Sequence, residues 1–222
     1  MAKRIGVILS GCGVYDGSEI HEAVITLLAI DRAGAEAVCM APDIPQMHVI
    51  NHLTGEPEAG ATRNVLIESA RIARGKIQDL AKVQASDLDA LILPGGFGAA
   101  KNLCNFAVAG ADCEVNAETT RLIKGMYAAK KPIAAVCIAP AVLSKVLGDE
   151  NISPKLTIGN DEGTAAALAT LGSEHIQCPV EEFVIDRDNK LVSSPAYMLA
   201  GRISEAAEGI EKTVQALIGM ID

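Results

Sequence analysis

Short apolar runs recur along the chain, separated by longer stretches in which apolar and polar residues alternate with helical spacing. Four of these runs end in glycine, proline or another small residue: RIGVILSG (4–11), AEAVCMA (35–41), LDALILPGG (88–96) and KPIAAVC (131–137). A continuous apolar run of this length is typical of a strand buried on both faces of a parallel sheet. We therefore expect four central strands in these ranges.

The segments between the strands have the spacing of amphipathic helices. The first, residues 18–35, has Ser18 as its expected N-cap and Gly34 as its end. Its large apolar residues predict one buried face, made of Ile20, Val24, Leu27 and Leu28. Further helices are expected at 116–131, 139–148 and 204–221, the last with Ile210, Val214, Leu217 and Ile218 on its apolar side. This alternation predicts an α/β fold whose mostly parallel sheet carries helices on both faces.

Two regions depart from the alternation. Residues 42–87 are rich in proline, histidine, asparagine and glycine, which favours a hairpin or an irregular excursion before a helix near 64–73. Residues 181–197, EEFVIDRDNKLVSSPAY, have the pattern of two strands around a polar turn. We expect this pair to be an antiparallel addition to the sheet.

Length and composition limit the class of protein. The chain has 222 residues, of which 50% are hydrophobic and 3% aromatic, enough to fill one aliphatic α/β core. We expect a single domain over residues 1–222. Six cysteines are scattered without a C-x-x-C pair, which favours reduced thiols and argues against a metal site.

Charge and hydropathy argue against nucleic-acid and membrane partners. The formal net charge is −9, and no cluster of lysine or arginine opposes it, so phosphate backbones and anionic lipids are repelled. No stretch approaches the roughly 18 uninterrupted apolar residues that span a bilayer. The apolar run after the basic start, Ile5 to Leu9, is too short for a secretory signal. We therefore expect a cytoplasmic protein.

Ligands of parallel α/β sheets bind beyond the carboxyl ends of the strands. There the loop PGGFGAAKN follows one strand, and Gly95, Gly96 and Gly98 leave backbone N–H groups free to approach an oxyanion closely. Neither this loop nor SGCGVYDG has the G-x-G-x-x-G spacing of a dinucleotide site. The loop therefore indicates an oxyanion site that uses no cofactor.

A cysteine lies where the fourth apolar run gives way to a helix. Cys137 has two interpretations, a buried core cysteine or a nucleophile exposed at a strained strand-to-helix elbow. In the second, the helix dipole favours the thiolate and lowers the pKa of Cys137. The N–H groups of Ile138 and Gly96 would then hold a developing oxyanion.

The same residues carry a family resemblance. The segments LDALILPGGFGAAKNL (88–103) and KPIAAVCIAPAVL (131–143) resemble the ThiJ/PfpI group of class I glutamine-amidotransferase-like proteins, with a Pro-Gly-Gly loop and Ala-x-Cys-x-x-Pro at the elbow. The opening (10–37) and the ending LVSSPAYMLA (191–200) resemble the isoprenoid-biosynthesis branch, the ElbB-type glyoxalases. The resemblance implies a flavodoxin-like three-layer sandwich, a homodimer, and Cys137 as nucleophile with Glu22 as the carboxyl group beside it.

Two features differ from related amidotransferases. Ile138 follows the cysteine where relatives place a histidine, and Gly159 and Asn160 stand in KLTIGND, the other segment in which a histidine would be sought, so a glutaminase triad is not expected. Of the remaining residues near the site, His21 has two interpretations, pocket rim or solvent-exposed. Cys12, which follows the first strand, is a candidate for the pocket wall or a resolving thiol.

Three functions remain open. The resemblance favours a glyoxalase that needs neither glutathione nor metal and converts glyoxal or methylglyoxal, rather than any larger molecule, through a hemithioacetal on Cys137. The alternatives are a redox sensor that oxidises the same cysteine and a partner protein that has kept the fold without the chemistry.

Overall fold

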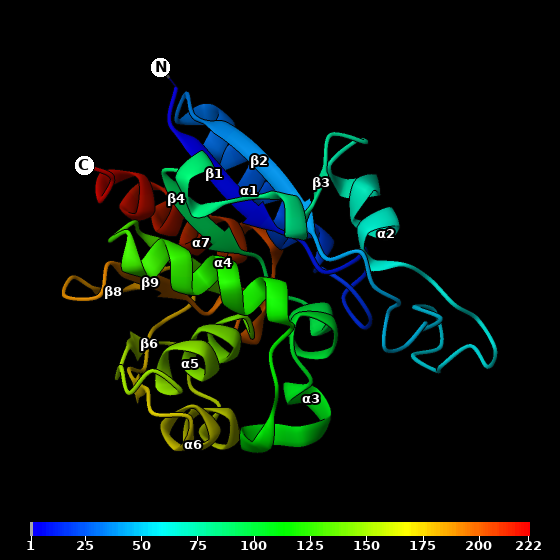
Figure 1. Ribbon diagram of the computed structural model, residues 1–222. Helices are drawn as coiled ribbons and strands as arrows, with labels where there is room; N and C mark the ends of the chain where they lie inside the picture. The colour runs from blue at the N-terminus through cyan, green and yellow to red at the C-terminus, as the bar shows by residue number, and fades with distance from the viewer. Residues whose placement is uncertain (1) are drawn as a thin grey trace.

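The computed structural model describes residues 2–222 and is built on a seven-stranded sheet (Figure 1). The strand order is β3-β2-β1-β4-β5-β9-β8. All neighbouring strands are parallel except β8, which is antiparallel to β9. The strands are β1 (Arg4–Ile8), β2 (Glu36–Ala41), β3 (Gln78–Asp79), β4 (Ala90–Leu93), β5 (Ile133–Val136), β8 (Val184–Asp186) and β9 (Leu191–Ser194). All four predicted central strands and the antiparallel addition are therefore confirmed.

Helices cover both faces of this sheet, as the apolar runs predict (Figure 1). One core combines Leu91, Leu93 and neighbouring strand residues with α4 (Ala117–Ala128) and α5 (Pro140–Gly148). The other combines Ala90, Ile92 and their neighbours with α1 (Ile20–Arg32) and α7 (Ile203–Gly219). Successive strand side chains point to opposite faces, so a run that is apolar throughout serves both cores. The three-layer, flavodoxin-like α/β sandwich is confirmed.

The first helix forms where predicted, but the opposite side of it is buried. Its N-cap is Glu19 rather than Ser18, and Ile20, Val24 and Leu28 of the predicted buried face are 43%, 47% and 41% exposed. The buried side is made instead of Glu22, Ala23, Ile25, Thr26, Ala29 and Ile30. Three of these residues, Ala23, Thr26 and Ala29, are small, which suits the close packing of α1 against α7 and the sheet. The prediction was wrong because both sides of this helix carry large apolar residues, Ile25 and Ile30 on the buried side as well as Ile20 and Leu28 on the exposed one, so hydrophobicity alone does not distinguish them.

The irregular region after β2 is confirmed, with one helix in it. Isolated antiparallel bridges join Pro45 to Asn64 and Ile50 to Pro57, after which α2 spans Val65–Ile72. The short edge strand β3 follows, which the sequence did not indicate. In Figure 1 this excursion projects to one side of the sheet.

Several short elements at the carboxyl end of the sheet were not predicted. A π-helical turn, Ala99–Leu103, leads into α3 (Phe106–Ala109). A two-stranded sheet of β6 (Lys155–Leu156) and β7 (Glu174–His175) flanks α6 (Glu162–Thr170). Figure 1 shows α3 and α6 at the same end of the molecule. None of the helices in residues 2–222 is long and apolar enough to cross a membrane.

Candidate active site

Cys137 lies at a strained turn directly after β5. Its φ is +60°, in the left-handed region that residues with a side chain rarely adopt. Its backbone N–H donates to the carbonyl of Ser194 at 3.0 Å, and α5 begins at Pro140, three residues later. The elbow predicted from the sequence is confirmed, and its strain aims the thiol away from the strand.

Glu22 lies beside this thiol and is completely buried. Its Oε1 accepts the backbone N–H of Tyr197 at 3.1 Å, and its Oε2 accepts that of Gly95 at 2.9 Å. Its carboxyl group is also hydrogen-bonded to the Cys137 thiol. The structure therefore brings Cys137 and Glu22 together, as the resemblance implied.

Glycine at position 95 is what allows this contact. A Cβ atom there would lie 2.4 Å from the Cβ of Cys137 and 2.7 Å from Oε2 of Glu22. Both distances are far below van der Waals contact, so any side chain would push the thiol and the carboxyl group apart. The backbone N–H of Gly95 serves Glu22, so it is not free for the oxyanion, and the predicted substrate-binding role of Gly95 is wrong.

The pKa values of the pair are both raised. Burial raises the pKa of Glu22 to about 7, although the backbone N–H of Tyr197 opposes the shift. Burial, followed by the charge of Glu22, raises the pKa of Cys137 well above its usual value. The prediction that the helix dipole lowers the pKa of Cys137 is therefore wrong, because desolvation of the buried sulfur outweighs the favourable amides.

Those amides are the ones expected from the sequence. The backbone N–H groups of Gly96 and Ile138 both hydrogen-bond the sulfur of Cys137. Gly96 has a φ of +91°, and a Cβ there would lie 2.3 Å from the backbone nitrogen of Glu19, so only glycine fits. Because both N–H groups point at the sulfur, they also lie close to the carbon that would bond to the sulfur and to the oxygen on that carbon.

The thiol opens into a cavity of about 310 Å³. Its wall comes from the loops after β1 and β4, the π-helical turn, α3, the β5–α5 junction, α6 and the turn after β9. The lining residues are Val14, Glu19, Gly96, Phe97, Ala100, Phe106, Ala107, Cys137, Ile138, Thr164, Tyr197 and Met198. Sequence reasoning found Gly96, Cys137 and Ile138 but missed most of the wall, since it comes from segments interpreted as loops.

Neither Cys12 nor His21 lines this cavity. Cys12 is half-buried, with Glu68 and Arg71 as its main charged neighbours, so its assignment to the pocket wall is wrong. His21 is exposed, and its Nδ1 is 2.8 Å from the hydroxyl of Tyr197, a residue that does line the cavity. His21 is thus exposed and contacts a cavity-lining residue without lining the cavity itself.

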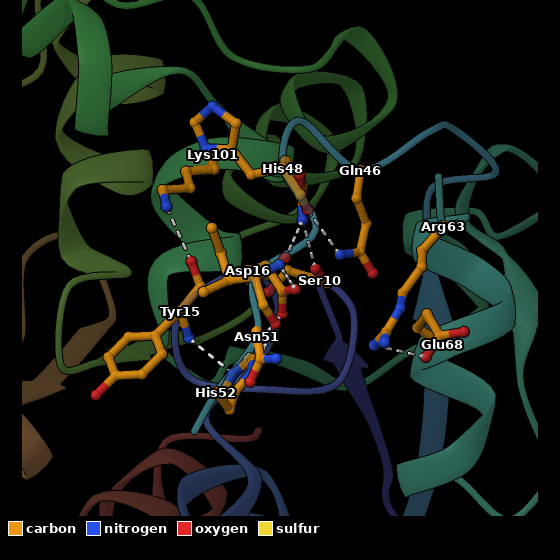
Figure 2. Close-up of polar contacts among 12 residues, drawn as sticks. Ser10, Tyr15, Asp16, Gln46, His48, Asn51, His52, Arg63, Glu68 and Lys101 are labelled. Carbon is orange, nitrogen blue, oxygen red and sulfur yellow. Dashed lines mark hydrogen bonds and ion pairs between the residues drawn. The ribbon is translucent and has the colours of Figure 1, made fainter. Parts of the chain in front are cut away.

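The loop after β1 is fastened beside the cavity by a polar network (Figure 2). The side-chain amide of Asn102 donates to the carbonyls of Ser10 and Asp16 at 2.8 and 2.9 Å. Lys101 donates to the carbonyl of Tyr15 at 2.9 Å, and His52 accepts the N–H of Tyr15 at 3.2 Å. These contacts hold in place the segment that supplies Val14 and Glu19 to the cavity wall. Lys101 and Asn102 therefore position the wall without lining the cavity themselves.

Glu19 is a cavity residue that had only a structural interpretation in the sequence. Its Oε2 accepts the N–H of Glu22 at 2.7 Å as the cap of α1, and its charge contributes to the raised pKa of Glu22. Glu19 lies three residues before Glu22, which is the spacing between an N-cap and the backbone N–H that it accepts. That spacing could have indicated from the sequence that Glu19 lies beside Glu22. Within residues 2–222, no group of three or more metal-ligating side chains is assembled.

Three curated relatives cover most of the chain. A human protein described as glutamine amidotransferase-like class 1 domain-containing protein 3, mitochondrial, is 48% identical over 98% of this chain and 83% of its own length. A rat ES1 protein homolog, mitochondrial, is 47% identical over 97% of this chain and 83% of its own. A zebrafish ES1 protein, mitochondrial, is 34% identical over 88% and 77%. The prediction of a cytoplasmic location is contradicted, because these relatives are mitochondrial.

Solved structures agree with the fold. An isoprenoid biosynthesis protein with an amidotransferase-like domain from Ehrlichia chaffeensis superposes with a TM-score of 0.93 at 37% identity, covering 100% of both chains. Drosophila melanogaster DJ-1beta, at 22% identity, covers 99% of this chain and 92% of its own with a TM-score of 0.60, which shows the shared fold. The model of the DJ-1/PfpI family matches residues 12–148. The chain therefore belongs to the DJ-1/PfpI family, as the Pro-Gly-Gly loop and the elbow cysteine predicted.

Proposed function

We propose that this protein is a cofactor-independent glyoxalase that converts 2-oxoaldehydes, of which glyoxal is the smallest, to 2-hydroxy acids. The observation that carries the proposal is the contact between Cys137 and Glu22 at the cavity, with the N–H groups of Gly96 and Ile138 directed at the sulfur. This arrangement joins a nucleophile, a proton acceptor and oxyanion donors. Addition of a thiol to a carbonyl needs these three parts.

In the first step, the sulfur of Cys137 bonds to an aldehyde carbon. The thiol is protonated at neutral pH, so a base must take its proton as the bond forms. Glu22 is suited to this because a pKa of about 7 leaves a large fraction of it ionised near neutrality. The former carbonyl oxygen becomes an alkoxide that accepts hydrogen bonds from the amides of Gly96 and Ile138. Glu22 then passes the proton it took from the thiol to this oxygen, which gives a hemithioacetal and leaves Glu22 ionised for the next step.

In the second step, a proton moves between the two carbons. Glu22 removes the hydrogen of the sulfur-bound carbon to give an enediol and returns it to the neighbouring carbon, which leaves a glycolyl thioester on Cys137. Water hydrolyses the thioester and regenerates the thiol. The sum is OHC–CHO + H₂O → HOCH₂–COO⁻ + H⁺, in which one carbon is oxidised and the other reduced without an external oxidant.

The raised pKa of Cys137 weighs against the redox-sensor alternative. Oxidation of a cysteine follows its thiolate character and its access to solvent. Burial raises the pKa of Cys137, and the residue is only 7% exposed. A thiol that stays protonated until a base beside it acts is better suited to turnover than to sensing peroxide.

The test is an assay of the purified protein with glyoxal in the absence of glutathione. We expect glycolate to form and Cys137→Ala to abolish its formation. Cys178→Ala serves as the matched control, since Cys178 is 8% exposed, close to the 7% of Cys137, and does not line the cavity. Glycolate formation at the wild-type rate in Cys137→Ala would overturn the proposed mechanism.

A further inference from the structure

The cavity at Cys137 is larger and more apolar than glyoxal requires. Its volume of about 310 Å³ is at the lower end of the range for pockets that hold small molecules, roughly 300–1,000 Å³. A water molecule takes about 30 Å³, so the space equals that of about ten waters. Glyoxal has only four non-hydrogen atoms and would leave much of this space unfilled.

The wall concentrates the aromatic residues of the chain. The sequence holds three phenylalanines, three tyrosines and no tryptophan. Of these six, Phe97, Phe106 and Tyr197 line the one cavity. Such rings bring large apolar area to a site and favour stacking against another ring. Their gathering here indicates a ligand with an apolar or aromatic part.

The apolar part of the cavity lies outward from the thiol. Cys137 is 7% exposed and Ala100 only 2%, so these residues lie at its inner end. Phe97 is 47% exposed and Ala107 on α3 is also exposed, which places them at the rim. A substrate whose aldehyde carbon reaches Cys137 therefore extends its substituent outward, toward Phe97 and α3.

We propose that the substrates of this site are 2-oxoaldehydes with an apolar or aromatic substituent, which the cavity binds better than glyoxal. The inference rests on the proposed glyoxalase function and differs from the expectation that larger molecules are excluded. The reaction is R–CO–CHO + H₂O → R–CHOH–COO⁻ + H⁺. Cys137 bonds to the aldehyde carbon, the hydrogen of that carbon moves to the ketone carbon, and water releases the acid.

The first experiment compares glyoxal, methylglyoxal and phenylglyoxal as substrates of the full chain, with Cys137→Ala as the blank. One methylene in an apolar pocket changes discrimination by roughly tenfold or more, so a phenyl ring should lower KM at least tenfold relative to glyoxal. Methylglyoxal should lie between. A KM for phenylglyoxal equal to or above that for glyoxal overturns the inference and leaves the glyoxalase proposal intact; no turnover of any substrate overturns the glyoxalase proposal.

Two variants on α3 test the place of the substituent. Ala107→Phe narrows the cavity at its rim and should raise the KM for phenylglyoxal at least fivefold, with a smaller effect on glyoxal. Val108→Phe adds the same ring to the next residue, which is 64% exposed and outside the cavity lining, and should leave both KM values unchanged. Equal effects of the two variants would contradict a substituent bound against α3.

A binding measurement separates the cavity from the chemistry. Acetophenone has the phenyl ketone but no aldehyde. Acetone is the control, because it has the same ketone with a methyl group in place of the phenyl ring. Acetophenone should slow the alkylation of Cys137 by iodoacetamide at least fivefold more than acetone at the same concentration, because it fills the space between the rings and the thiol. Equal protection by both ketones would overturn the inference even in a protein without turnover.

Discussion

The buried carboxyl group of Glu22 should make stability depend on pH in a way that Glu22→Gln removes. The pKa of Glu22 rises from 4.5 to about 7 on folding, so the folded state keeps a proton that the unfolded state has released. The resulting stabilisation is present below pH 4.5 and is lost as pH rises through 7. At about 1.4 kcal/mol per unit, the loss between pH 5 and pH 8 is about 2–3 kcal/mol.

Glutamine has no proton to lose, but it also fits the site less well. Both carboxyl oxygens of Glu22 accept a backbone N–H, from Tyr197 and from Gly95. The single oxygen of glutamine can accept only one of these, and an unpaired buried N–H costs about 1–3 kcal/mol. Glu22→Gln should therefore be the less stable protein at pH 5, and by pH 8 the difference should have nearly vanished or changed sign.

Urea unfolding of both proteins at pH 5 and pH 8 measures this difference. The free energy of unfolding of wild type minus that of Glu22→Gln should fall by about 2–3 kcal/mol between the two pH values. Glu58→Gln, at an exposed glutamate, controls for the general effect of removing a carboxylate. A difference that stays constant within about 0.5 kcal/mol would refute the raised pKa of Glu22 and with it the role of this residue as a base near neutrality.

Three further outcomes follow from the site. Gly95→Ala should lower glyoxal turnover at least a hundredfold by separating the thiol of Cys137 from its base, since displacements of about 1 Å can cost that much; Gly201→Ala, where a Cβ meets nothing closer than 3.7 Å, should keep wild-type turnover. Glu19→Gln removes a charge that raises the pKa of Glu22 and should move the acidic limb of the kcat–pH profile to lower pH; an unmoved limb would exclude that coupling. Alkylation of Cys137 by iodoacetamide should have its midpoint above pH 9, and a midpoint below pH 8 would restore the dipole-stabilised thiolate.

The strands could be predicted because their apolar runs serve two cores at once. A central parallel strand excludes polar residues from both faces, and little else in a soluble chain has that pattern. The first helix could be located but not oriented. Its inward side carries the polar residues Glu22 and Thr26 beside apolar ones, while Ile20, Val24 and Leu28 are exposed. A hydrophobic pattern cannot identify a buried face that holds a functional carboxyl group.

The chemical centre of the site could be predicted better than its surroundings. Cys137 stands out by its place between strand and helix, and Gly96 by the glycine-rich loop, because each depends on a short local pattern. Glu22 came from the resemblance, since 115 positions of sequence separate it from the cysteine it contacts. The use of the Gly95 amide by Glu22 depends on tertiary contacts that no local pattern encodes.

Two features that cost stability occur together at Cys137: a strained backbone, and a buried thiol beside a buried carboxyl group. A left-handed backbone at a residue with a side chain costs about 1–2 kcal/mol, and a buried carboxyl group beside a thiol resists ionisation of both. Neither feature is needed to hold the sheet together, because an unstrained residue could connect β5 to α5. Together, however, the strain directs the sulfur toward Glu22, and the burial brings the pKa of that carboxyl group close to neutrality. Local departures from the rules of stability that reinforce one another in this way are expected where a chain carries out chemistry.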